Sequence, residues 1–409
     1  MEEMEEIEIV IVGAGICGLA TALALHRKGI KSVVLERSES LRASGAGITI
    51  RTNGWRCLDQ LGVGSDRRHT ALPLQGGREM QLSNGKIKEI SLGRRAETRC
   101  MRRSDLIRIL AESLPLGTIH LGYQILSVTL DPLTSYPIIQ LQTGSSRFNL
   151  SLIILQVLIG CDGANSVVAD FLELEPKILL SLSETRGFTN YPSGHDFEME
   201  FFQVSEGDNI MVGRLPIDNK LVYWFVNQKI KPKGAVIAKD PELIHKLTLE
   251  SIKDFPTEVV DMIRNSERES ISQVRLVHRA PWELLVGSFR KGSVTVAGDA
   301  MHVMGPFMAQ GGSAAIEDGV VLARCLAQKL HEIDIKTNGW RRRHIVGEAL
   351  DQYVKERRMR LVWLSTQSYL HILLIDSTPP LLVRLICIVL LMLFFSDYAA
   401  HTQYDCGRL

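Results

Sequence analysis

The sequence lacks paired cysteines and a strong excess of charge, and its first residues are not those expected of a leader segment. Its seven cysteines are scattered and include no CxxC pair, so neither a disulfide framework nor a zinc or other metal site is expected. The net charge of +1 gives no bulk attraction to nucleic acid or to a membrane. The N-terminus, Met-Glu-Glu-Met-Glu-Glu, has neither the basic nor the apolar segment of a secretory leader. A cytoplasmic protein in a reducing compartment is therefore expected.

Long apolar runs are also absent. The longest runs from Leu385 to Phe395, which is 11 residues, or 15 if it begins at Leu381 and includes Arg384. A membrane-spanning helix needs about 20 residues. We therefore expect a helix over 346–375 and, after it, a short helix over 381–395 that packs against the protein and does not span a membrane. Membrane-surface association is the less favoured alternative.

The length of 409 residues, with 45% hydrophobic and 23% charged residues, is typical of a globular chain with two or more lobes. Strand patterns at 177–230 predict an antiparallel sheet, and a hairpin is expected at 78–92, around Asn84-Gly85. Helices are expected at 104–110, with Ser104 as the cap, and from Pro241 to about Asn265.

The segment from residue 9 to residue 36 carries the strongest motif. Ile9–Val12 is a β-branched apolar run, typical of a strand buried on both faces. Gly13, Gly15 and Gly18 form a GxGxxG turn into an alanine- and leucine-rich helix, whose free N–H groups and positive dipole end suit a pyrophosphate. Glu36 ends the next strand, where a carboxylate accepts hydrogen bonds from a ribose. In this order, these elements predict a dinucleotide site.

Two later segments repeat the pattern of a strand that ends in a polar turn. The first is a strand ending in Asp162-Gly163, which taken alone is an ordinary turn. In the second, a buried-type strand ends in Gly298-Asp299, and Gly311-Gly312 open a long helix after a short loop. Asp299 then lies at the carboxyl end of a strand, where sheets of this type bind ligands. The bare helix end at Gly311-Gly312 would stabilise negative charge on a ring.

Together these segments resemble the single-component FAD-dependent aromatic monooxygenases, the para-hydroxybenzoate and salicylate hydroxylases, and most closely the salicylate-hydroxylase-like monooxygenases of plants. The resemblance implies an α/β fold: a Rossmann-like FAD-binding domain with a parallel sheet, interleaved with an antiparallel-sheet substrate domain and followed by C-terminal helices. The implied parts are residues 1–76, 98–172 and 276–345 for FAD, 77–97 (a hairpin) and 173–275 for substrate, and 346–409 for the helices.

The resemblance also implies a cofactor and a reaction. FAD would be held non-covalently, NADH or NADPH would be the reductant, and a flavin hydroperoxide formed with O₂ would hydroxylate a small phenolic acid-like substrate. The residues implicated in cofactor binding are Gly13, Gly15, Gly18, Glu36, Arg37, Arg103, Asp162, Gly163, Asp299, Gly311 and Gly312. An FAD-dependent epoxidase of an isoprenoid-type substrate and a non-catalytic FAD-binding relative that acts through a partner are the alternatives.

The sequence names candidates, but no single residue, for assisting substrate deprotonation. His302 follows the Asp299 loop and could equally make a structural hydrogen bond. Tyr223 lies on a strand rich in aromatics, which are often core. Pro306 is a candidate for a different catalytic role, because the resemblance places it over the flavin face. A loop at Ser44–Gly47 could close over the ring.

The sequence departs from the family pattern at four positions. Val168 stands where an arginine or lysine often closes the Asp-Gly motif, and Ala309 where glycine is usual. Gly305 and Phe307 are unusual neighbours of Pro306. The change at Val168 bears on the binding of the reductant more than on FAD.

Overall fold

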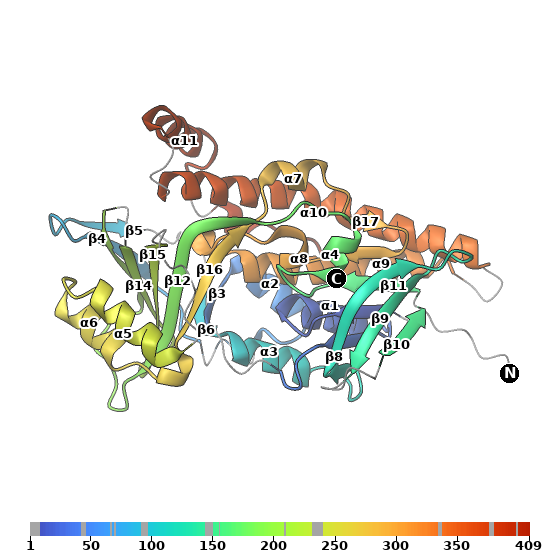
Figure 1. Cartoon of the computed structure of the whole chain (residues 1–409), viewed down its shortest axis with the longest axis horizontal. Helices are drawn as coiled ribbons and strands as arrows, with labels where there is room; N and C mark the ends of the chain where they lie inside the picture. Colours follow the sequence, from blue (N-terminus) through green and yellow to red (C-terminus); the bar gives the residue numbers. More distant parts are fainter. Residues whose placement is uncertain are drawn as a thin grey trace.

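The computed structural model describes residues 9–41, 46–65, 68, 71–90, 97–143, 150–154, 156–207, 210–230, 240–333, 338–375, 380–397 and 400–409. These residues form a parallel-sheet region and an antiparallel-sheet region, with a long helix, α10 (Gly339–Ile375), running along one side (Figure 1). The expected fold class is confirmed, whereas the exact domain boundaries stay a prediction.

The first sheet has six strands in the order β17-β18-β11-β1-β2-β7, parallel except for β17. Its central strands β1 and β11 are fully buried, as their apolar runs predict. Helices α1 (Ile16–Arg27) and α9 (Gly311–Leu330) pack against each other beside this sheet. The strands are β17 (Arg290–Lys291), β18 (Val294–Val296), β11 (Val157–Gly160), β1 (Ile9–Val12), β2 (Val33–Glu36) and β7 (Ile119–Leu121).

The second sheet has seven strands in the order β16-β12-β15-β14-β13-β4-β5. All pairs are antiparallel except β13 with β4. The hairpin expected at 78–92 is confirmed, since β4 and β5 pair and form one edge of this sheet. The strands are β16 (Ser272–His278), β12 (Ile178–Asn190), β15 (Leu221–Lys229), β14 (Ile210–Pro216), β13 (Glu200–Glu206), β4 (Gly76–Gln81) and β5 (Ile87–Ile90).

Two helices, α5 (Pro241–Ser251) and α6 (Thr257–Arg264), cover one face of this second sheet (Figure 1). Val212, Trp224 and Val226 point from the strands into their shared core. The helical segment expected from Pro241 to about Asn265 is confirmed, but it consists of two helices. Pro256 disfavours helical geometry in the residue before it and is itself the N-cap of α6, so the helix breaks there.

Smaller elements connect the two sheets. Strands β3 (Gly47–Arg51) and β6 (Thr98–Arg102) pair and run into α2 (Thr52–Gln60) and α3 (Arg103–Glu112). The cap predicted at Ser104 was wrong, because the N-cap of α3 is Arg102, two residues earlier. The N–H of Arg103, the first helical residue, donates to the Ala46 carbonyl oxygen. The remaining strands and α-helices of the described residues are β8 (Tyr123–Leu130), β9 (Pro137–Thr143), β10 (Leu150–Ile154), α4 (Val167–Phe171), α7 (Pro281–Val286) and α8 (Asp299–His302).

Helix α11 (Leu381–Phe394) follows α10 and stands outside the body, at the end of α10 beside the antiparallel sheet (Figure 1). The expectation that it packs on the protein holds for one side only, because Cys387 is its single buried residue. Among the described residues, none of the helices combines the length and apolar character that crossing a membrane requires.

Candidate functional site

The glycine turn after β1 has the shape that a bound diphosphate needs. Gly13 has a φ of +99°, and a Cβ there would lie 2.7 Å from the Cys161 carbonyl oxygen. A Cβ on Gly18 would lie 2.0 Å from the Gly13 carbonyl oxygen, so this glycine lets α1 pack against the turn. A Cβ on Gly15 would meet only the Arg103 guanidinium, at 3.9 Å. Gly15 and the start of α1 therefore leave backbone open to a ligand, with a cation opposite.

Glu36 lies at the end of β2, next to this turn. Its carboxylate accepts hydrogen bonds from the Ala14 N–H at 2.8 Å and the Ser38 N–H at 3.0 Å. It lines a cavity of about 140 Å³ together with Gly13, Gly15 and the exposed Arg37. The remaining lone pairs of the carboxylate can accept from a ribose, the role expected from the sequence.

Asp162 and Gly163 follow β11 and line the same small cavity. One oxygen of Asp162, Oδ2, accepts from the Val167 N–H at 2.8 Å. The other, Oδ1, is buried and finds no hydrogen-bond partner within the described part of the chain. Burial raises the pKa of Asp162, although hydrogen bonds from Ser166 and from backbone N–H groups oppose the rise. A donor on a bound ligand would satisfy this orphaned acceptor.

A second cavity, of about 1150 Å³, continues from the first one, because Gly15, Arg103, Cys161 and Gly163 line both. Asp299, Pro306, Gly311 and Gly312 line the large cavity. Asp299 opens α8 directly after Gly298, whose φ of +61° and close approach to the Cys17 side chain permit no Cβ. A Cβ on Gly311 would meet nothing, so the N-terminus of α9 is open to the cavity.

The antiparallel sheet forms the opposite wall of the large cavity. Residues alternate along its strands, so Tyr223 and Phe225 face the cavity while Trp224 faces α5 and α6. The Tyr223 ring occupies the space of a Gly47 side chain, whose Cβ would lie 2.4 Å from the ring. Of the loop expected at Ser44–Gly47, only Ala46 and Gly47 belong to the described residues, and both line this cavity.

The polar groups on this wall were missed from the sequence. Arg186, Glu184 and Asn227 line the cavity, and the Arg186 guanidinium lies 3.4 Å from the Glu184 carboxylate. Burial raises the pKa of Glu184, partly offset by Arg186. Burial and the nearby Glu184 charge also raise the pKa of Tyr223 well above its usual value. The only sequence signal for these residues is the alternation of side chains between the two faces of β12 and β15. This alternation does not show which face lines the cavity and which packs in the core.

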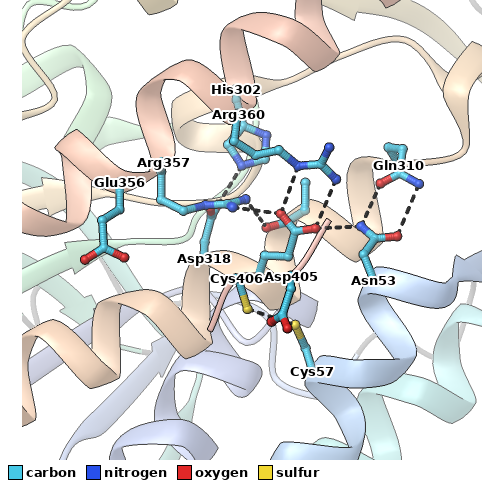
Figure 2. A network of polar contacts seen from close by, with 12 residues as sticks. Asn53, Cys57, His302, Gln310, Asp318, Glu356, Arg357, Arg360, Asp405 and Cys406 are labelled. Carbon is cyan, nitrogen blue, oxygen red and sulfur yellow. Dashed lines mark hydrogen bonds and ion pairs between the residues drawn. The ribbon is translucent and has the colours of Figure 1, made fainter. Parts of the chain in front are cut away.

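His302, unlike Tyr223 and Pro306, is not among the residues that line the cavity. It is fully buried, and its Nε2 donates to Asp318 Oδ2 at 2.5 Å. Arg357 also bonds Asp318 and Glu317, and Asn53 joins Glu317 to Gln310 at the start of α9. Figure 2 shows His302 and Arg357 directed at Asp318, and Asn53 beside Gln310.

This network supports the cofactor side of the cavity. Asp318 Oδ2 also accepts from the Gly298 N–H at 2.8 Å, and Gly298 directly precedes Asp299. Gln310, held by Asn53, precedes the open helix end at Gly311. The geometry thus gives His302 the structural hydrogen bond that the sequence left open as its alternative.

Of the eleven residues implicated in cofactor binding, all except Gly18 line one of the two joined cavities. The glycine cradle, the orphaned Asp162 oxygen and the open end of α9 fit a dinucleotide at one end and a planar, charge-accepting ring at the other.

Comparison with known proteins agrees with this geometry. Residues 6–364 match the family described as "FAD binding domain". The chain is 47% identical to Monooxygenase 1 of Arabidopsis thaliana, covering 99% of this chain and 100% of that protein. It is 27% identical to 3-hydroxybenzoate 6-hydroxylase 1 of Aquipseudomonas alcaligenes, covering 80% of this chain and 82% of that one.

A solved structure has the same fold. Klebsiella pneumoniae HpxO, complexed with FAD and uric acid, aligns with a TM-score of 0.75 at 19% identity, covering 98% of this chain and 94% of that one. The family match extends over both sheets and over most of the residues that line the joined cavities, including the glycine turn, the Asp-Gly segment and the Asp299 segment. The chain therefore belongs to the FAD-binding-domain family of FAD-dependent monooxygenases, the group of the aromatic hydroxylases.

Proposed function

We propose that this monooxygenase hydroxylates a small phenolic acid-like substrate, with O₂ and with NADH or NADPH as reductant. The observation that supports the proposal is the single cavity that joins the FAD-side residues Asp299 and Gly311 to Tyr223 and Arg186. Its volume of about 1150 Å³ exceeds the roughly 300–1,000 Å³ typical of a site for one small ligand. Two molecules, a cofactor and a substrate, fit this size better than one.

On the cofactor side, the chain's own groups bind and orient. The Gly15 turn and the start of α1 would hold the diphosphate, Glu36 the ribose and Asp299 the ribityl hydroxyls. The N-terminus of α9 would stabilise negative charge on the ring edge. Bound FAD, once reduced by NAD(P)H, supplies the activation of O₂ that protein side chains cannot provide.

On the substrate side, Arg186 would pair with a carboxylate, since a guanidinium forms strong charge-assisted hydrogen bonds with that group. Tyr223 keeps its proton on Oη because burial raises its pKa, and it can therefore donate to the phenolic oxygen. Phe201, Phe225 and Leu215 form an apolar wall that excludes water. The carboxylate contact and the aromatic wall together favour an aromatic acid.

The test measures NADH and NADPH oxidation by the FAD-loaded protein with a panel of phenolic acids and their uncharged analogues. We expect oxidation to accelerate with a substrate bound, and mass spectrometry to show the gain of one oxygen atom. The proposal would be refuted if no phenol changed the rate at which the FAD-loaded protein oxidises NADH or NADPH and no oxygenated product formed.

A variant pair tests the role of Arg186. Arg186→Gln should raise KM for acids by roughly ten- to a hundredfold, equivalent to about 1.5–3 kcal/mol, and leave KM for uncharged phenols nearly unchanged. Arg102→Gln is the matched control, because Arg102 lies over the Phe188 ring at 4.7 Å but is not among the cavity-lining residues. Equal effects of the two changes would remove Arg186 from the substrate site.

A further inference from the structure

Helix α11 (Leu381–Phe394) presents a broad apolar face to solvent. Nine of its fourteen residues are large apolar side chains with exposed fractions of 38–73%. At 100° per residue, eight of the nine fall within an arc of about 160°. This face is too wide and too continuous to be a scatter of single exposed apolar residues.

The opposite side of α11 rests on α10, which fixes the direction of the apolar face. Cys387 is buried on that side. Trp363 of α10 contacts the rings of Phe394 and Phe395, with centroids 6.3 and 5.0 Å apart. Arg384, which flanks the face, donates to the Leu374 carbonyl oxygen at 3.4 Å. The helix therefore sits on its support with its apolar face directed outward.

We propose that this face docks on the surface of a lipid bilayer. Residues 381–395 contain one arginine and no aspartate or glutamate, so no acid opposes contact with anionic headgroups. A helix of 14 residues is about 21 Å long, shorter than the roughly 30 Å hydrocarbon core. It would therefore lie in the plane of the interface and not cross it.

A second copy of the chain fits the face less well. A single helix about 21 Å long and about 10 Å wide covers on the order of 200 Å². A stable protein interface needs about 800 Å² from each partner. Binding to a bilayer has no such minimum contact area, because lipid acyl chains adapt to the side chains of a single helix.

Docking would also bring the large cavity to the lipid surface. The cavity lining includes His371, Leu374 and Ile375 in the last turns of α10, and Ser396 and Asp397 just after α11. Ser396 and Asp397 are exposed, so the cavity reaches the surface beside the C-terminal end of α11. A compound dissolved in the lipid would then have a short route to the cavity.

The test is flotation of the FAD-loaded full chain with vesicles of phosphatidylcholine and phosphatidylglycerol. The disruptive variant combines Leu385→Ser, Val389→Ser and Met392→Ser on the exposed face. The control variant combines Leu116→Ser and Leu133→Ser, whose side chains are 104% and 91% exposed and lie outside α11. The parent and the control should float with the vesicles, and the disruptive variant should lose at least tenfold of its bound fraction. Visible absorbance should show equal FAD content in all three.

Three outcomes would overturn the proposal. The parent protein could stay at the bottom of the gradient, or the disruptive variant could float as well as the control. The third is a concentration-dependent dimer in sedimentation velocity that the disruptive variant disperses, which would assign the face to a second copy. Neither readout depends on catalytic activity, so the result stands apart from the test of the proposed reaction.

Discussion

Arg357 is the cation on which the buried network behind the FAD site depends. Its guanidinium lies 2.7 Å from both Glu317 and Asp318, and all three side chains are fully buried. Replacing Arg357 with alanine would leave two carboxylates in the interior with fewer partners. Breaking a buried ion pair by removing one partner costs about 3–5 kcal/mol, because a charge remains without compensation.

The partners that remain place the expected loss near the lower end of this range. Glu317 keeps Arg360 at 3.1 Å and Asn53 at 2.6 Å. Asp318 keeps His302 at 2.5 Å and the Gly298 N–H at 2.8 Å. We therefore expect Arg357→Ala to lower the free energy of unfolding by about 3 kcal/mol. FAD affinity should fall as well, because the Gly298 turn carries Asp299.

The assay is urea unfolding of the apoprotein, followed by circular dichroism. Arg290→Ala is the matched control: Arg290 makes two 2.7 Å hydrogen bonds to Asp351, but the two side chains are 30% and 58% exposed. Exposed pairs contribute about 0–1 kcal/mol. If the two alanine variants lose the same stability, burial does not set the strength of this network and the reasoning is wrong.

Three further changes have expected outcomes. Gly18→Ala puts a Cβ 2.0 Å from the Gly13 carbonyl oxygen, so we expect about 1–3 kcal/mol of destabilisation and protein that purifies without yellow colour, measured by absorbance. Ala309 has a left-handed φ of 48°, so Ala309→Gly should raise thermal stability by up to about 1 kcal/mol; a fall in Tm would contradict this. Burial alone would raise the pKa of Asp318, but His302 and Arg357 lower it from 3.8 to about 2. This carboxylate therefore stabilises the fold above about pH 4. In urea titrations of the parent protein, the free energy of unfolding should fall by roughly 2 kcal/mol between pH 4 and pH 2. The fall should be smaller in Arg357→Ala.

The FAD side was predictable from the sequence because its information is local. Gly13, Gly18 and Glu36 lie within one strand-turn-helix-strand unit, where sequence spacing fixes spatial distance. Asp162 and Asp299 follow strands β11 and β18, which pair directly with each other in the parallel sheet. Their turns therefore had to meet at one edge of that sheet.

The substrate side was not predictable, because it depends on register between distant strands. Arg186 faces the cavity beside Phe225 because β12 pairs with β15, about forty residues later, in one particular register. A shift of β12 by one residue would have turned Arg186 towards α5 and α6. The exposed face of α11 was missed for a similar reason, because the sequence of an apolar helix is the same whether the helix is buried in the protein or exposed to solvent.

The departures from the family pattern are explained by packing in two places. A Cβ on Gly305 would lie 2.6 Å from the Phe307 ring, so these two unusual neighbours of Pro306 require each other. Val168 is fully buried, and its side chain fills the space beside Gly160, where a Cβ would approach to 2.6 Å. A charged residue at position 168 would have to leave that site. A cation reaches the Asp-Gly segment from elsewhere, because Lys177 donates to the Ala164 carbonyl oxygen at 2.8 Å and contacts Asn165. Lys177 therefore places a positive charge beside this turn, although position 168 carries none.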